Sequence, residues 1–98
     1  MYTTKEILNS LLDGQMRFED LLDIEKDLAE IMKINNYTKP LLHKEIPITM
    51  VCMNLVQSIK VANCKFSTEV PISSFYENPL CQFWLNKAEA ALDVSSEI

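Results

Sequence analysis

The residue types that most often carry catalysis are scarce in this chain of 98 residues. His43 is its only histidine, and the cysteines Cys52, Cys64 and Cys81 form no close pair in sequence. A histidine-based metal site needs further ligands at short, fixed spacings, and none of those spacings occurs. His43 with one of the cysteines would make a nucleophile pair only if the fold brought them together, which the sequence does not indicate. We therefore expect no metal and no cofactor.

Carboxylates are the second group whose spacing suggests chemistry. Glu19 with Asp23, and Asp23 with Asp27, lie four residues apart and would be neighbours on the surface of one helix. An acid–base pair needs a concave, partly apolar setting that moves the two pKa values apart, and a convex helix face does not provide one. A magnesium site would need ligands from a second acidic segment, which is missing. We therefore predict that the protein is not an enzyme.

The composition also excludes several kinds of partner. Gly14 is the only glycine, whereas phosphate-binding loops need glycines so that the backbone can approach the ligand. Direct binding of DNA or RNA needs a basic patch, and the lysines are too sparse to form one. The longest uncharged stretch, residues 46–59, is 14 residues long and contains Pro47, whereas a membrane span needs about 20 residues. We expect no direct contact with nucleic acid or membrane.

The net charge of −5 is confined to one segment. Residues 13–30 contain seven acids against Arg17 and Lys26, which gives −5, and the remaining residues balance to zero. The acids of this segment that fall opposite its apolar face, or at the edge of that opposite side, are the candidate partner-binding residues Glu19, Asp20, Asp23, Asp27 and Glu30. Such a stripe is either the solvated side of an amphipathic helix or a docking surface for a basic partner.

The elements that carry these residues are predicted to be helices. A single glycine argues against an all-β fold, which needs glycine-rich turns. Apolar residues recur at helical spacing in four segments. The sequence therefore predicts one all-α domain over residues 1–98, a compact bundle with short irregular connections and four main helices at about 4–13, 17–34, 47–63 and 79–93.

Local signals set the ends of these helices. Thr3 and Glu6 have the spacing of a capping box, and Gly14 is a natural helix stop. Asn78 followed by Pro79 predicts the start of the last helix. The second helix should end at the asparagines that follow residue 34. Residues 37–46 and 64–78 are the least regular parts, with a short helical turn expected at 72–76.

Apolar periodicity predicts which faces are buried. The arc of the second helix centred on Leu21, Ile24 and Leu28 should be extended by Phe18, Leu22 and Ala29. The last helix should bury Leu80, Cys81, Trp84, Leu85, Ala88, Ala91 and Leu92. The third helix is apolar on most sides, with a weakly polar remainder that includes Thr49 and Ser58. It is therefore expected at the centre of the bundle.

A second candidate surface is rich in methionine and aromatic residues, which are enriched at interfaces. It comprises Met50, Met53, Phe75, Tyr76 and Phe83. One interpretation is a homodimer, oligomer or ligand surface, and the other is a core that wraps around more than one side of the third helix. Cys52 and Cys81 are expected to be core residues, and Cys64 to be partly exposed.

These features favour a small non-enzymatic protein that acts by binding another protein, through the acidic face of the second helix. The partner would be basic, for example a nucleic-acid-binding protein. The size and acidity are typical of inhibitor, accessory and immunity-type proteins of phages and mobile elements. Unpaired cysteines and the absence of a leader pattern predict a cytoplasmic location. The alternative is a protein that sequesters or senses a small ligand or nucleotide and oligomerises through the methionine and aromatic surface.

Overall fold

The fold is a bundle of α-helices, as the sequence predicts. The computed structural model describes residues 4–38, 45–65 and 67–96. These contain four α-helices, α1 (Thr4–Asp13), α2 (Phe18–Thr38), α3 (Glu45–Ala62) and α4 (Pro79–Ser96). A short 3₁₀ helix, η1 (Ile72–Phe75), lies between α3 and α4 where a helical turn was expected.

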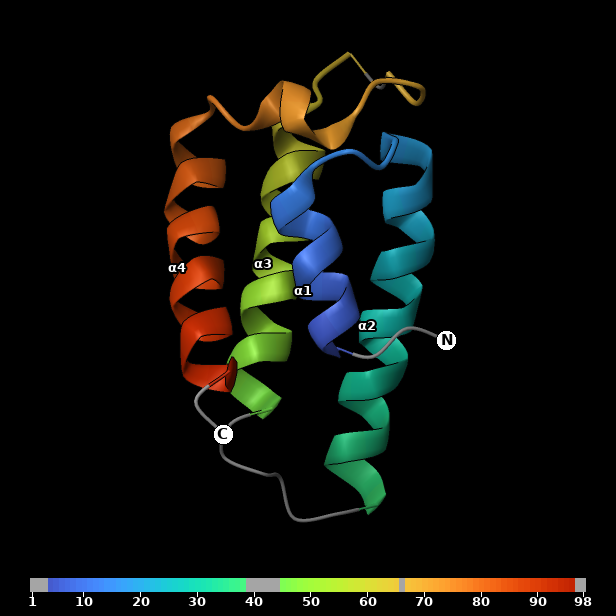
Figure 1. The fold of residues 1–98 in the computed structure, drawn as a ribbon. Coiled ribbons are helices and arrows are strands. Elements are labelled where there is room, and N and C mark those ends of the chain that lie inside the picture. Colours follow the sequence, from blue (N-terminus) through green and yellow to red (C-terminus); the bar gives the residue numbers. More distant parts are fainter. Residues whose placement is uncertain (1–3, 39–44, 66, 97–98) are drawn as a thin grey trace.

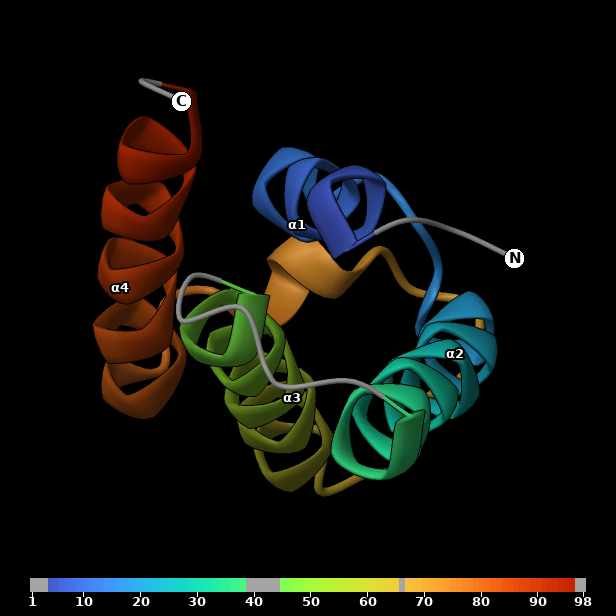
Figure 2. The same ribbon diagram turned by 90° about the horizontal axis from the view of Figure 1, so that it is seen from below.

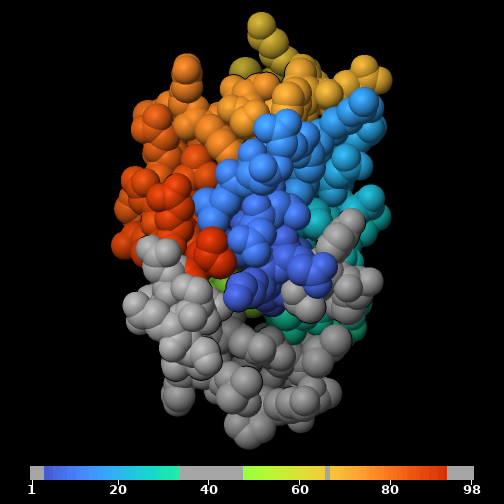
Figure 3. All heavy atoms as spheres, viewed as in Figure 1, coloured from blue at the N-terminus to red at the C-terminus, as the bar shows by residue number. Residues whose placement is uncertain are grey.

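Helix α3 lies at the centre of the bundle and packs against each of the other three α-helices. Its most extensive contact is with α4, which runs antiparallel beside it (Figures 1 and 2). Helix α1 lies in front of α3, and its side chains cover the front of the bundle between α4 and α2 (Figure 3). Helices α1 and α2 touch each other far less than either touches α3.

The side chains of α3 are buried on several sides of the helix, which agrees with its central position. Cys52, Leu55, Val56 and Ile59 are fully buried in the core. Thr49 and Ser58, from the side predicted to be weakly polar, are also buried, because a helix touched from several sides has little free surface. The hydroxyl of Ser58 donates a hydrogen bond to the carbonyl oxygen of Asn54, one turn earlier, at 2.8 Å. The side chain therefore has a hydrogen-bonding partner inside the bundle.

Three helix ends differ from the sequence prediction by two or more residues. Helix α2 continues to Thr38, past the asparagines expected to end it, because asparagine costs only a few tenths of a kcal/mol within a helix and is a weak stop. Helix α3 begins at Glu45 rather than 47, and Pro47 is tolerated because the first turn of a helix has no internal amide hydrogen bonds to lose. Helix α4 extends beyond residue 93 to Ser96, since no glycine or proline interrupts it.

Some side chains predicted to be buried are exposed. Leu22 and Ala29 were expected to extend the core face of α2, yet Leu22 is 39% exposed and Ala29 is also exposed. Helix α2 packs mainly against α3, so only a narrow arc of its surface is covered. Leu80, in the first turn of α4, is 47% exposed because it lies at the edge of the buried face centred on Cys81 and Ala88.

Residues 68–73 close one end of the bundle by pairing with the connection between α1 and α2. The amide of Phe18 donates to the carbonyl of Val70, and that of Glu19 to Thr68, both at 3.0 Å. The amide of Ile72 donates in turn to the carbonyl of Met16 at 2.9 Å. The first amides of α2, which have no partner within the helix, are therefore satisfied by a distant segment of the chain.

A hydrogen bond made by Tyr76 links α1 to the segment that follows η1. Its hydroxyl donates a hydrogen bond to the carbonyl of Leu11 in the last turn of α1. Burial raises the pKa of the Tyr76 hydroxyl well above its usual value, and the nearby Cys81 and Asp13 add to this shift. The phenol therefore stays protonated and remains a donor.

A Tyr76→Phe variant should lose about 1–2 kcal/mol in free energy of unfolding, because the Leu11 carbonyl loses its donor while the ring still packs. Urea denaturation followed by circular dichroism would measure this loss. Ser74→Ala, which changes an exposed residue of the same segment, is the matched control and should leave stability within about 0.5 kcal/mol. Equal stability of the Tyr76→Phe variant and the unmodified protein would contradict the role given to this hydrogen bond.

Candidate functional site

The acidic residues singled out from the sequence lie along α2. Glu19, Asp20, Asp23 and Glu30 are exposed, and Asp27 is half-buried. Asp20, Asp23, Asp27 and Glu30 follow one another at spacings of three or four residues, which places them along one side of the helix. Glu19 lies apart from this line, and its carboxylate is 3.8 Å from the guanidinium of Arg17.

One acid of the segment faces the bundle rather than the solvent. The two carboxylate oxygens of Glu25 lie 3.1 and 3.0 Å from the ammonium of Lys60 on α3. The side-chain amide of Gln57 donates to the same carboxylate. These contacts tie α2 to α3 and partly neutralise Glu25, so Glu25 contributes little to the acidic face. The net negative charge of α2 therefore lies on the side of the helix that carries Asp20, Asp23, Asp27 and Glu30.

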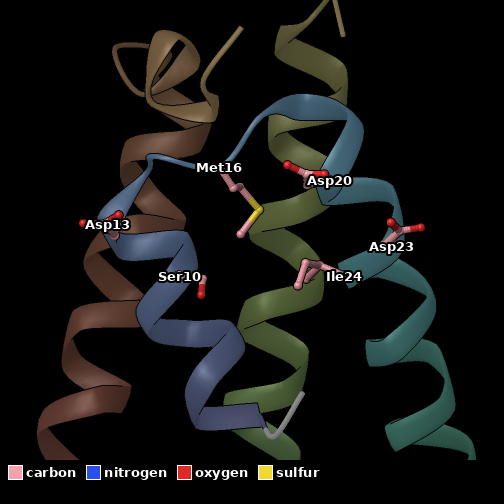
Figure 4. Close-up of a pocket in the computed structure, with 6 residues that line it drawn as sticks. All are labelled: Ser10, Asp13, Met16, Asp20, Asp23 and Ile24. Carbon is pink, nitrogen blue, oxygen red and sulfur yellow. The ribbon is translucent and has the colours of Figure 1, made fainter. Parts of the chain in front are cut away.

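A hollow of about 500 Å³ opens between α1 and α2 beside this charge (Figure 4). The side chains of Met16 and Ile24 point into the gap and form its apolar part. Three aspartates also line it: Asp13 at the end of α1, and Asp20 and Asp23 in the first turns of α2. Of these, Asp20 lies nearest the gap, and the carboxylates of Asp13 and Asp23 lie at its outer edges (Figure 4). The complete lining is Ser10, Asp13, Met16, Asp20, Asp23 and Ile24.

This lining suits a long cationic side chain. An arginine or lysine has an aliphatic stem, which would pack on Met16 and Ile24, and a charged head, which would reach the carboxylates. Among the described residues, no basic side chain pairs with Asp13, Asp20 or Asp23. Their negative charge is therefore not compensated from within the described part of the chain.

The hollow does not have the form of a metal site. In the described ranges, no three histidine, cysteine or acidic side chains converge closely enough to hold an ion. The aspartates are spread around an opening shared by two helices (Figure 4). Such an arrangement favours an extended cationic group over a single ion, because a metal ion needs its ligands within about 2–2.6 Å.

The hollow adds residues that the sequence prediction missed. Asp13 was counted in the charged segment, but it was not chosen as a contact residue because it precedes the predicted second helix. Ser10, Met16 and Ile24 also line the hollow. The signal available for Asp13 was its position at the end of one helix, with the next helix starting after a four-residue connection. Such a connection forces the two helix ends together.

The predicted methionine and aromatic surface is divided between core and exterior. Phe75 and Tyr76 are half-buried and pack against the core, with the Phe75 ring 6.1 Å from that of Phe18 in an edge-to-face arrangement. Met53 is also half-buried. Met50 and Phe83 are 48% and 51% exposed. Met53, Phe75 and Tyr76 are therefore partly used in packing the core, whereas Met50 and Phe83 remain at the surface.

The cysteines differ in environment as the sequence predicts: Cys52 and Cys81 are buried, and Cys64 is exposed. Burial raises the pKa of the Cys52 thiol to about 12 and also raises that of Cys81. A buried, protonated thiol is a poor nucleophile. His43, the other group considered for catalysis, lies outside the described residues.

Cys64 should therefore be the one thiol of the native protein that reacts rapidly with a thiol reagent at pH 8. Cys52 and Cys81 should react only after denaturation. Absorbance of the released chromophore would count the modified cysteines over time. A Cys64→Ser variant should lose the rapid phase, whereas Cys81→Ser should retain it. A rapid phase that survives Cys64→Ser would show that another cysteine is accessible.

Comparison of the chain with protein-family models, with curated proteins and with solved structures finds no match. No helix in the described part of the chain combines the length and the apolar character that crossing a membrane requires.

Proposed function

We propose that this protein is a non-enzymatic binding protein whose partner is a basic protein, and that the partner docks on the acidic side of α2 and the hollow beside it. The observation that supports this most strongly is the hollow itself. It combines an apolar floor with three carboxylates, Asp13, Asp20 and Asp23, that have no basic partner among the described residues. Uncompensated charge at a concave site favours association with an oppositely charged surface.

The proposed partner carries arginine or lysine side chains on a convex segment. One of them would enter the hollow, and others would pair with the carboxylates further along α2, such as Glu30. Proteins that bind nucleic acid have such surfaces, because they contact phosphates. By occupying that surface the protein would act as an inhibitor or as an accessory protein. Three free cysteines favour a reducing, cytoplasmic setting for this interaction.

The salt dependence of partner capture tests this proposal. The tagged protein would be incubated with an extract of its native host at about 50 mM and about 500 mM salt, since screening at the higher concentration shortens the range of charge interactions to a few ångströms. We expect a basic protein to be retained at low salt and released at high salt. Retention of a partner that resists high salt, or of an acidic partner, would contradict the proposal.

A further inference from the structure

The hollow lies between two helices that make few contacts with each other. Helix α1 contributes Ser10 and Asp13 to its lining, and α2 contributes Asp20, Asp23 and Ile24. Helix α3 supports both helices from the side of the core. The end of α1 and the start of α2 lie at the same end of the bundle, beside η1 (Figure 1). The spacing of the two walls therefore also depends on what holds these two helix ends.

Residues 67–76, which we call the frame segment, bond to both helix ends. On the side of α2, the first two amides of the helix donate to carbonyls of this segment at 3.0 Å. On the side of α1, the hydroxyl of Tyr76 donates to the carbonyl of Leu11. Between these contacts, the amide of Ile72 donates at 2.9 Å to the carbonyl of Met16, which itself lines the hollow. One continuous segment therefore holds both walls.

Asn63 anchors the start of the frame segment to the end of α3. It follows the last residue of α3, and its side chain is buried. Its amide nitrogen donates to the carbonyl of Ser67 at 2.9 Å, and its amide oxygen accepts from the backbone amide of Ser67 at 3.0 Å. The next residue, Thr68, accepts the amide of Glu19 at the start of α2. Only a side chain with both a donor and an acceptor makes this pair of bonds, since an aspartate lacks the donor and an alanine lacks both.

We propose that Asn63 and Tyr76 are positioning residues for the hollow. Asn63 fixes the frame segment where it meets α2, and Tyr76 fixes it where it meets α1, so together they set the spacing of the carboxylates on the two walls. Neither side chain lines the hollow itself. The consequence for binding rests on the proposed function: a hollow whose walls are already in place binds a basic side chain more tightly than one whose walls must first be ordered.

The distance between α1 and α2 in the free protein tests the proposal without any partner. Spin labels attached at Asn9→Cys on α1 and Lys26→Cys on α2 would report this distance in pulsed EPR spectra. Both positions are exposed, and neither lines the hollow. The labelled protein would also carry Cys64→Ser, so that the remaining native cysteines, which are buried, stay unlabelled.

The label-to-label distances should form one narrow distribution in the protein with its frame intact. Asn63→Ala and Tyr76→Phe should each shift or broaden it, because one wall loses its attachment to the frame segment. The matched controls are Asn54→Ala, which removes an amide from α3 outside the frame segment, and Ser74→Ala, which removes an exposed hydroxyl within it. Both controls should leave the distribution unchanged. Asn63→Asp, which keeps the acceptor for the Ser67 amide, is the milder variant to use if Asn63→Ala does not fold.

A residue that only stabilises the fold would give a different result. Circular dichroism would establish the unfolding midpoint of each variant, and the distances would be measured well below it. If the variants at Asn63 and Tyr76 lower the midpoint but leave the distance distribution unchanged, the two residues do not position the walls and the proposal is overturned.

Calorimetric titration with an arginine hexapeptide separates this inference from the proposed function. Asn63→Ala and Tyr76→Phe should weaken peptide binding by at least about 5-fold, because binding must then also order a wall of the hollow. Unchanged binding in both variants, together with weakened binding in the double variant Asp20→Lys, Asp23→Lys, would overturn the positioning role and leave the proposed function standing. Equal binding by the unmodified protein and that double variant would instead count against the proposed function, and the distance measurement would still decide on the positioning role.

Discussion

A Gly14→Ala variant should be less stable than the unmodified protein by about 2–3 kcal/mol, a large part of the roughly 5–15 kcal/mol that holds a domain of this size together. Gly14 has a φ of +73°, a conformation that costs a residue with a Cβ atom about 1–2 kcal/mol. The new Cβ would also lie 2.9 Å from the Cβ of Ser73 and 3.1 Å from the Tyr76 ring. Neither neighbour is the free end of a flexible side chain, so the backbone segments must move apart.

Thermal unfolding would measure this effect, with an expected fall in Tm of roughly 10–20 °C. Gln15→Ala is the matched control, because Gln15 is exposed and adjacent in sequence, and it should change Tm by only a few degrees. The amide of Ser73 donates to the carbonyl of Gly14 at 3.2 Å, so the close approach is part of the closure of this end of the bundle. A stable Gly14→Ala variant would contradict that packing.

Reversing the charge at the hollow should have the largest effect on function. In the double variant Asp20→Lys, Asp23→Lys, we expect the affinity for the basic partner to fall by at least about 100-fold, because two attractive contacts become repulsive. Titration calorimetry with the purified partner would measure the change. The two side chains are exposed, so the fold should be retained.

The matched control is the double variant Glu77→Lys, Glu89→Lys. It changes the net charge by the same amount, at two exposed residues away from the hollow. Its affinity should fall only a few-fold, through the general weakening of electrostatic steering. Equal losses in the two double variants would show that net charge matters and that the hollow has no particular role.

The helices could be predicted because their apolar residues recur at helical spacing. The predicted bounds of α1 and the predicted start of α4 match the structure, and α3 is central because it is apolar on nearly every side. The exposure of Leu22 and Leu80 could not be predicted. Periodicity shows which residues share a face, but the width of the buried arc depends on how many neighbours pack against the helix.

The candidate site could be predicted only in part. The acidic residues of α2 were visible as a helical stripe, and the structure adds Asp13, Met16 and Ile24 around a hollow. Glu25 belongs to the acidic segment, but in the structure its carboxylate pairs with Lys60 and adds little to the acidic face. The sequence does not show this pairing, because Lys60 is 35 residues away and the contact depends on how α2 and α3 pack. Likewise, Phe75 and Tyr76 pack into the core through contacts with Phe18 and Leu11, which local sequence does not specify.

The binding footprint on the protein tests the central claim most directly. Amide NMR spectra of the isotope-labelled protein, recorded as the purified partner is added, would locate the contact surface. We predict the largest shifts at residues around the hollow, including Ser10, Asp13, Asp20 and Asp23, with α4 largely unchanged. Shifts concentrated on α4 and the outward side of α3, with the hollow unchanged, would contradict the account.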